Sequence, residues 1–273
     1  MKIAVLGPKG TYSDLAAKAY NPNLERIYFP TIGDSINAIN DETIAIIPYE
    51  NSLDGFVSNS MDLLYNPNIK IIDELYLKVQ FSLVANCNNE SEIKRIYAQF
   101  KAKGQCYNFL NNHKDASIII TESNMASLEE VNLGKWGDAA IIPIHSYDES
   151  FQFKIKNITD SCQNQTRFFV ISNKNINYSH NNLDKLKGNI VVTSINDRPG
   201  MLYEILKSFY DSGLNLVSIV SRPTKSEIGK YHFYLEIEID EKIDIFTKTI
   251  NKMKENKDYN VMVLGIYNIK NHE

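Results

Sequence analysis

The segment Asn164-Gln165-Thr166-Arg167-Phe168 separates a polar loop, residues 160–163, from an apolar run that ends at residue 171. The apolar run predicts a buried strand that opens directly out of a polar cluster. A hydroxyl from Thr166 and a guanidinium from Arg167 are therefore expected next to each other at the mouth of this strand. Arginine offers a planar fork of donors that suits a carboxylate, and threonine offers a neutral hydroxyl that can donate one hydrogen bond. Taken alone, the segment also fits a strand-forming threonine followed by a surface charge.

Two further polar turns follow predicted strands and strengthen the case for a ligand site. The first, residues 7–13, comes after the strand expected at residues 2–6 and precedes a helix expected at residues 14–20, with Ser13 as its N-cap. A strand, a glycine turn and a helix N-terminus together present backbone amides to an anion, so the amides around Gly10 and Thr11 are candidates to hold a carboxylate. The glycine spacing matches neither the dinucleotide-binding fingerprint nor the ATP-binding P-loop.

The second turn, residues 48–55, follows the apolar run at residues 44–47. Ligands bind α/β sheets at the carboxyl ends of the strands, so this turn delivers Glu50, Asn51 and Ser52 to the expected ligand edge. Asn51 and Ser52 are neutral donors there, although both also fit ordinary turn chemistry. Glu50 is a candidate base or acid, or a structural partner of Arg167.

The order of elements predicts an α/β protein made of two α/β subdomains and a C-terminal unit. Subdomain 1 is expected at about residues 1–78 and 155–174, and subdomain 2 at about residues 79–154, with a ligand cleft between them. A polar linker at residues 175–187 then leads to a ferredoxin-like βαββαβ unit at residues 188–273. Within subdomain 2, helical stretches are expected at residues 90–94, 103–112, 124–131 and 144–149.

Composition restricts the classes of partner. The chain has 273 residues, 43% of them hydrophobic, and a net charge of −4, which argues against a nucleic-acid partner. No apolar run approaches the roughly 20 residues that a membrane-spanning helix needs, so no membrane partner is expected. Three scattered cysteines and the lack of a signal sequence favour a reducing cytoplasm. The five histidines show no metal-ligand spacing, so no metal site is expected.

The three turns, taken together and in this order, resemble the motifs of the prephenate dehydratase family. The matching segments are residues 7–13, residues 48–57, and residues 158–160 with residues 164–168. The C-terminal unit resembles the family's ACT regulatory domain. The segments Pro199-Gly200-Met201-Leu202, Gly213-Leu214-Asn215-Leu216 and Ser221-Arg222-Pro223 are similar to its phenylalanine-binding signature.

This resemblance implies two lobes similar to periplasmic binding proteins and a carbon-oxygen lyase, which converts prephenate to phenylpyruvate with loss of water and CO₂ and without a cofactor. Thr166 is expected to donate to the leaving hydroxyl, and Glu50 to orient its neighbours. The expected catalytic set is Thr166, Arg167, Glu50 and Asn51, and the expected substrate-binding set is Gly10, Thr11, Ser52, Gln105 and Phe168. Arg167, Asn51, Ser52 and the amides around Gly10 and Thr11 would hold the carboxylates of prephenate.

The resemblance also implies a homodimer or homotetramer with L-phenylalanine as feedback inhibitor, bound between paired ACT domains. The expected effector-binding residues are Pro199, Gly200, Met201, Leu202, Leu214, Asn215, Ser221, Arg222 and Pro223. Three positions depart from the family pattern. Phe81 replaces a histidine, Gln99 lies where the family has Ser-His-Pro, and Val220 replaces an acidic residue. The last of these leaves the identity of the effector open.

Alternatives to this function come from two classes. Within enzymes, a relative that prefers arogenate fits the same motifs, whereas a decarboxylase that does not aromatise prephenate is disfavoured by the intact segment from Thr166 to Phe168. A non-catalytic sensor of carboxylates or amino acids is the alternative outside enzymes, and Phe81 and Val220 are its best support. Product formation distinguishes the sensor from the enzymes.

Overall fold

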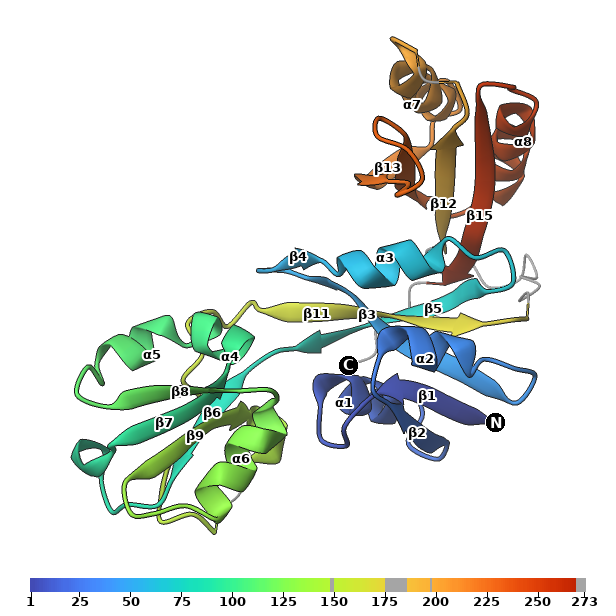
Figure 1. Cartoon of the computed structure of the whole chain (residues 1–273). Coiled ribbons are helices and arrows are strands. Elements are labelled where there is room, and N and C mark those ends of the chain that lie inside the picture. Colours follow the sequence, from blue (N-terminus) through green and yellow to red (C-terminus); the bar gives the residue numbers. More distant parts are fainter. Residues whose placement is uncertain (148–149, 175–185, 197, 269–273) are drawn as a thin grey trace.

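The computed structural model describes residues 1–147, 150–174, 186–196 and 198–268, which form three β-sheets with helices packed on them (Figure 1). This arrangement confirms the predicted α/β fold with two subdomains and a C-terminal ferredoxin-like unit. Most of the predicted linker, residues 175–185, lies outside the described residues. The last sheet begins at Leu186, inside the range predicted for the linker.

The sheet of subdomain 1 has the strand order β2-β1-β3-β11-β5, with the short β4 beside β3. Strands β1, β2 and β3 are parallel, and β11 runs antiparallel to both β3 and β5. Helix α1 packs on one face of the sheet, and α2 and α3 pack on the other. The bounds are β1 Lys2–Leu6, α1 Tyr12–Tyr20, β2 Glu25–Phe29, α2 Ile32–Asn37, β3 Thr43–Asn51, β4 Gly55–Phe56, α3 Ser58–Leu64, β5 Lys70–Lys78 and β11 Gln165–Ser172.

The sheet of subdomain 2 has the order β10-β6-β9-β7-β8, with α4 and α5 on one face and α6 on the other. Its bounds are β6 Phe81–Ala85, β7 Arg95–Gln99, α4 Phe100–Gln105, α5 Tyr107–Asn111, β8 Ser117–Thr121, α6 Asn124–Asn132, β9 Asp138–Pro143 and β10 Phe153–Ile155. Two helix predictions fail here. Residues 90–94 and 144–149 contain only short 3₁₀ turns, Glu90–Glu92 and Ile144–Ser146, with residues 148–149 outside the description. The single helix expected at residues 103–112 is divided into α4 and α5 at Cys106, where the backbone leaves the helical region.

The C-terminal unit is a four-stranded antiparallel sheet, in the order β13-β14-β12-β15, with α7 and α8 on one face. Its bounds are β12 Leu186–Ser194, α7 Met201–Asp211, β13 Asn215–Pro223, β14 Tyr231–Glu238, α8 Ile243–Lys254 and β15 Tyr259–Asn268. Side chains alternate across a strand, so Ile190 and Val192 of β12 face the helices while Val191 faces the first sheet. Strand β12 is therefore buried on both faces.

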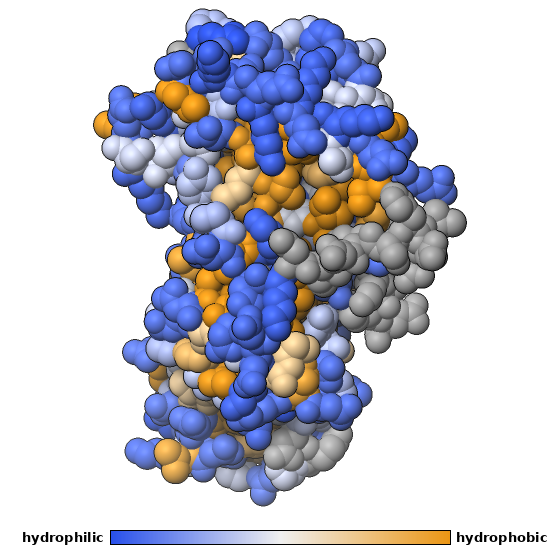
Figure 2. All heavy atoms as spheres, turned by 90° about the vertical axis from the view of Figure 1, so that its right-hand side faces the viewer, coloured by the Kyte–Doolittle hydropathy of each residue, from blue (hydrophilic) through white to orange (hydrophobic). Residues whose placement is uncertain are grey.

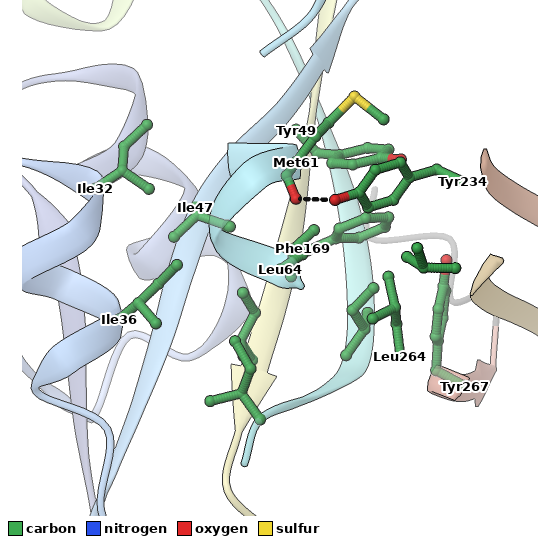
Figure 3. Close-up of a cluster of buried hydrophobic side chains, with 14 residues drawn as sticks. Ile32, Ile36, Ile47, Tyr49, Met61, Leu64, Phe169, Tyr234, Leu264 and Tyr267 are labelled. Atoms are coloured by element: carbon green, nitrogen blue, oxygen red, sulfur yellow. Dashed lines mark hydrogen bonds between the residues drawn. The ribbon is translucent and has the colours of Figure 1, made fainter. Parts of the chain in front are cut away.

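The second face of the C-terminal sheet packs directly on subdomain 1. Figure 3 shows Tyr234, Leu264 and Tyr267 of this sheet beside Met61 and Phe169, and Tyr234 donates a hydrogen bond of 2.8 Å to the Met61 carbonyl. Strands β15 and β5 approach so closely that a Cβ added to Gly265 would lie 2.2 Å from the Ile71 carbonyl oxygen. In Figure 2, polar residues cover most of one side of the molecule, while apolar residues gather on the C-terminal unit and at its junction with subdomain 1.

Candidate active site

The site is built around the cross-strand pair formed by Thr166 on β11 and Asn51 on β3. Asn51 Nδ2 donates to Thr166 Oγ1 at 3.0 Å. A hydroxyl that accepts this hydrogen bond keeps its own hydrogen for another partner, and no acceptor for it is found among the described residues. Thr166 is half-buried where β11 begins. The sequence therefore places a neutral donor at the expected position.

A chain of buried amides leads from Thr166 to subdomain 2. Asn51 Nδ2 also donates to Asn164 Oδ1 at 2.8 Å, and Asn164 Nδ2 donates to Gln105 Oε1 at 2.8 Å. Asn164 is fully buried, and Asn51 and Gln105 are each 8% exposed. With its oxygen bound, Gln105 keeps its two amide hydrogens for other partners. Asn51 and Gln105 were predicted as site residues. Asn164 was not, although it is the first residue of the segment 164–168 that contains Thr166.

The loops beside these amides are fixed by capping interactions. Ser52 Oγ accepts from the Gln165 amide at 3.0 Å, and Asn51 Oδ1 accepts from the amides of Leu53 and Asp54 at 2.9 and 3.0 Å. The Asp160 carboxylate caps α5 by accepting from the amides of Tyr107 and Asn108 at 2.8 and 3.1 Å. Asn51 and Ser52 thus fulfil the turn roles that were open to them, with the Asn51 side-chain nitrogen directed at Thr166.

The turn between β1 and α1 differs from the prediction at its cap. Thr11, not Ser13, is the N-cap of α1, and its hydroxyl accepts from the Asp14 amide at 3.3 Å. The Gly10 amide donates to the Asp14 carboxylate at 2.9 Å, so that amide is already bound to an anion of the protein itself. The expectation that the Gly10 amide holds a substrate carboxylate is corrected accordingly. Gly10 has φ +87°, a conformation that glycine adopts without strain.

Two aromatic residues that the sequence analysis did not single out join this turn to subdomain 2. The Tyr12 hydroxyl donates to the Gln80 carbonyl and accepts from the Gln80 amide, and its ring contacts Phe81 edge-on at 6.0 Å. His145 Nε2 lies 3.1 Å from the Gly10 carbonyl oxygen, and its ring contacts Tyr12 at 5.1 Å. Burial lowers the pKa of His145, so the neutral imidazole is favoured at neutral pH. Phe81, which replaces the family's histidine, is buried.

Arg167 does not join Thr166. Its guanidinium is 5% exposed and binds the carboxylates of Glu74 on β5 and Glu236 on β14. Glu50, its cross-strand neighbour, lies 3.7 Å from Nη1, in agreement with the structural partnership considered for it. The prediction that Arg167 holds substrate carboxylates is wrong for this structure, because consecutive residues of a strand point to opposite faces.

Phe168 also differs from its predicted role. It is 1% exposed and packs with Ile46, Leu75 and Val170 in the core beneath α1. A side chain enclosed in this way supports the strand that carries Thr166, and it presents no free surface to a substrate.

The predicted effector residues occupy both ends of the C-terminal sheet. Pro199 to Leu202 form the start of α7, where Gly200 has φ +85°. Leu214 and Asn215 lie where β13 begins, and Ser221 to Pro223 form its other end, so within one chain the strand separates these two groups. Arg222 pairs with Asp62 of α3 at 3.0 Å and donates to Ser58. The described residues contain no group of three or more metal-ligating side chains placed to hold an ion.

Comparison with known proteins follows the same division of the chain. The family model for prephenate dehydratase matches residues 3–176, and that for the ACT domain matches residues 189–255. The prephenate dehydratase of Methanocaldococcus jannaschii is 32% identical over 254 residues, which cover 90% of this chain and 91% of the relative.

Solved structures agree with the sequence relatives. The crystal structure of the prephenate dehydratase from Staphylococcus aureus subsp. aureus Mu50 superposes with a TM-score of 0.81 at 28% identity, covering 98% of this chain and 100% of that one. The prephenate dehydratase of Arthrobacter aurescens in complex with L-Phe gives a TM-score of 0.79 at 26% identity, covering 98% and 90%. No helix in the described part of the chain is both long and apolar enough to cross a membrane.

Proposed function

Because the chain belongs to the prephenate dehydratase family and carries an ACT domain, we propose that it converts prephenate to phenylpyruvate, water and CO₂. The observation that carries this proposal is the Thr166 hydroxyl, which accepts from Asn51 and keeps its hydrogen for a ligand. The identity of the substrate is inferred from the relatives named above, and the identity of the hydrogen-bond donor from the geometry of this chain.

The reaction needs a donor of this kind. Prephenate carries a ring hydroxyl opposite the carboxylate that departs as CO₂. As the bond between the ring and this carboxylate breaks, its electron pair enters the ring, the ring becomes aromatic, and the hydroxyl leaves with its own electron pair. Thr166 donates a hydrogen bond to the departing oxygen, which takes up one proton, supplied in the end by solvent, and is released as water. General acid assistance of this kind contributes about 10²–10⁴-fold in rate.

The substrate carboxylates are held in this proposal by neutral donors. The guanidinium of Arg167 is bound elsewhere, and the Asn51 amide and the Ser52 hydroxyl already donate to protein acceptors. The remaining candidates from the predicted set are Gln105 and the Thr11 segment. Gln105 has two amide hydrogens available because its oxygen is bound to Asn164. Neutral donors also fit the chemistry, because overly strong binding of the departing carboxylate would stabilise the ground state and slow the reaction.

Regulation by L-phenylalanine through the ACT domain is part of the proposal, supported by the relative from Arthrobacter aurescens that was crystallised with L-Phe. The expected effector residues lie at the N-terminus of α7 and at the two ends of β13, so a second copy of the chain is needed to bring them together. A homodimer or homotetramer in the cytoplasm is consistent with this arrangement and with three unpaired cysteines.

A direct assay tests the proposal. Purified protein is incubated with prephenate at neutral pH, with and without L-phenylalanine, and phenylpyruvate is followed against a control without enzyme, because prephenate also decays in acid. Phenylpyruvate formation that L-phenylalanine suppresses is the expected result. Arogenate is assayed in parallel as an alternative substrate. A folded protein that binds prephenate and forms no product would contradict the enzymatic function and favour a sensor.

A further inference from the structure

A buried ion network joins β11 to the ACT domain directly behind the proposed catalytic threonine. Arg167 donates from Nε to Glu74 at 2.7 Å, and from Nη1 and Nη2 to the two Glu236 oxygens at 2.7 Å each. Lys187 of β12 binds Glu74 at 2.8 Å and Glu236 at 2.9 Å. Two cations and two carboxylates thus form the centre of the network, drawn from two strands of subdomain 1 and two strands of the ACT domain. Arg167 Nη2 also donates to the Tyr267 hydroxyl at 3.1 Å, and Glu50 lies 3.7 Å from Nη1.

The burial of this network makes its members depend on one another. Glu74 is fully buried, Glu236 is 2% exposed and Arg167 is 5% exposed. The guanidinium is further enclosed by the rings of Phe169 and Tyr49, which lie 4.8 and 5.5 Å from its central carbon. Charges at this depth are tolerated only with their partners in place, so loss of one partner leaves the others uncompensated. The position of Arg167 is therefore tied to the docked ACT sheet.

The position of Thr166 follows from that of Arg167. The two residues are consecutive on β11, so their Cα atoms are about 3.8 Å apart and joined by a planar peptide. The register of β11 against β3 shifts between Arg167 and Phe168, whereas its register against β5 continues unbroken from Gln165 to Val170. The backbone pairing fixes the strand within its own sheet, and the side chain of Arg167 adds a constraint perpendicular to that sheet, toward the ACT domain.

We propose that Arg167 is a positioning residue that fixes the Thr166 hydroxyl through its buried contacts with Glu236, so that full turnover requires the docked ACT sheet. The inference rests on the proposed dehydratase function. Misplacement of a reacting group by about 1 Å can lower the rate by about a hundredfold, so loss of this anchor lowers kcat while the substrate contacts persist.

The test changes Glu236, which lies in the ACT domain, and leaves both Arg167 and Thr166 intact. Glu236→Gln removes the charge, and Glu236→Asp keeps the charge but shortens the side chain beyond the reach of the paired contact. We expect kcat for prephenate to fall at least tenfold in both variants, with KM within about twofold of the parent. Turnover is normalised to the folded fraction measured by circular dichroism. If Glu236→Gln does not fold, Glu236→Asp decides.

Asp62→Asn is the matched control, because it breaks the ion pairs of Asp62 with Arg222 and Lys225 of the ACT domain, at 3.0 and 2.7 Å, without touching the buried network. It is expected to keep the parent kcat in the absence of L-phenylalanine. Hydrogen exchange of the peptide containing residues 165–168 should accelerate in the Glu236 variants and not in Asp62→Asn.

Three results would overturn the inference. A Glu236 variant with unchanged kcat and only a lower melting temperature would make the network purely structural. A raised KM at unchanged kcat would place Arg167 or its partners in substrate binding. An equal loss of kcat in Asp62→Asn would attribute the effect to docking in general. A parent protein that forms no phenylpyruvate would instead contradict the proposed function, which separates the two failures.

Discussion

At the scale of single residues, the site depends on which hydrogens remain free. Asn51 Nδ2 lies within 3.1 Å of three acceptors, the oxygens of Asn164, Gln165 and Thr166, although it has two hydrogens to give. An amide that is shared in this way is held firmly in one orientation. The same contacts leave the Thr166 hydroxyl hydrogen and the Gln105 amide hydrogens unassigned among the described residues.

Thr166→Val tests the donor directly, because valine keeps the shape of threonine and lacks the hydroxyl. We expect kcat to fall by about 10²–10⁴-fold with little change in KM, since general acid assistance is lost and the carboxylate contacts remain. Thr166→Ser keeps the hydroxyl and should retain most of the activity. Steady-state kinetics with prephenate measure both variants, and near-parental turnover in Thr166→Val would remove this residue from the mechanism.

The cysteines provide a second prediction at this scale. Burial raises the pKa of the Cys106 thiol to about 12, and burial also raises the pKa of Cys87. Only Cys162 is exposed. Because the thiolate is the reactive form, one of the three thiols should react rapidly with a disulfide reagent in the native protein, and all three after unfolding. Rapid reaction of a second thiol in the folded protein would show that subdomain 2 is less closed around Cys106 than described.

At the scale of elements, β11 serves two sites at once. Its Thr166 face looks toward the packing of α1, and its Arg167 face meets the ACT sheet. The same alternation recurs in β14, where Leu235 and Ile237 contact the helices of the ACT domain while Tyr234 and Glu236 face subdomain 1. Both strands are therefore buried on each side, and a polar residue in either of them needs a partner from another element.

The close approach of β15 to β5 is sensitive to a single methyl group. Gly265→Ala would place a Cβ 2.2 Å from the Ile71 carbonyl oxygen, so the two strands must separate. We expect a loss of about 1–3 kcal/mol in the free energy of unfolding, as for other overpacked cores. Gly104→Ala, in α4, meets nothing within 4 Å and is the control, expected to be neutral or slightly stabilising. Denaturant unfolding measures both, and equal stability of the two variants would contradict the described contact.

The alternation of strands also explains how far the sequence could predict the site. Thr166 and Asn51 were identified from turns at the ends of apolar runs, and they are a cross-strand pair in the structure. Arg167 was assigned to the substrate because it is adjacent to Thr166 in sequence, although adjacency in a strand implies opposite faces. The opposite orientation of Thr166 and Arg167 could therefore have been predicted from the sequence. Its partner Glu236 was not predictable, because the sequence does not state which face of the ACT sheet docks on subdomain 1.

Local sequence patterns predicted most strands and helices correctly. They were less reliable for the ends of helices, which depend on capping interactions and on breaks in the helix. The cap of α1 is Thr11 rather than Ser13 because the helix begins at Tyr12, so Ser13 lies inside its first turn and the Thr11 hydroxyl accepts from the Asp14 amide. The helix expected at residues 103–112 divides at Cys106, next to the loop that Asp160 fixes from a distant part of the chain. Such interactions between distant segments leave no periodic signal in the sequence.

At the scale of the whole molecule, the two domains are joined by ion pairs of very different burial. Arg222 and Asp62 are 23% and 21% exposed in their side chains, so solvent screens their attraction. Arg167 and Glu236 are 5% and 2% exposed, and breaking such a buried pair by removing one partner costs about 3–5 kcal/mol. Removal of one partner from the buried network should therefore cost more stability than removal of one partner from the exposed pair, and the network should respond to pH.

The lowered pKa of Glu236 predicts how the free energy of unfolding changes at acidic pH. Burial alone would raise the pKa of its carboxyl, but Arg167 and Lys187 outweigh burial and hold the pKa below its ordinary value of 4.5. A carboxyl with a depressed pKa in the folded state stabilises the protein above the pKa of the unfolded state, and this contribution is lost as pH falls through the folded value. The parent should therefore lose stability steeply below about pH 4.5.

Glu236→Gln should lack that part of the slope, so the difference in free energy of unfolding between the two proteins narrows as the pH falls from 7 toward 3. Urea unfolding at a series of pH values measures this difference, with Asp62→Asn as the comparison for a more exposed pair. A difference that stays constant across the whole range would mean that the pKa of Glu236 is the same in the folded and unfolded states, and Arg167 and Lys187 would then give its charged form no net stabilisation.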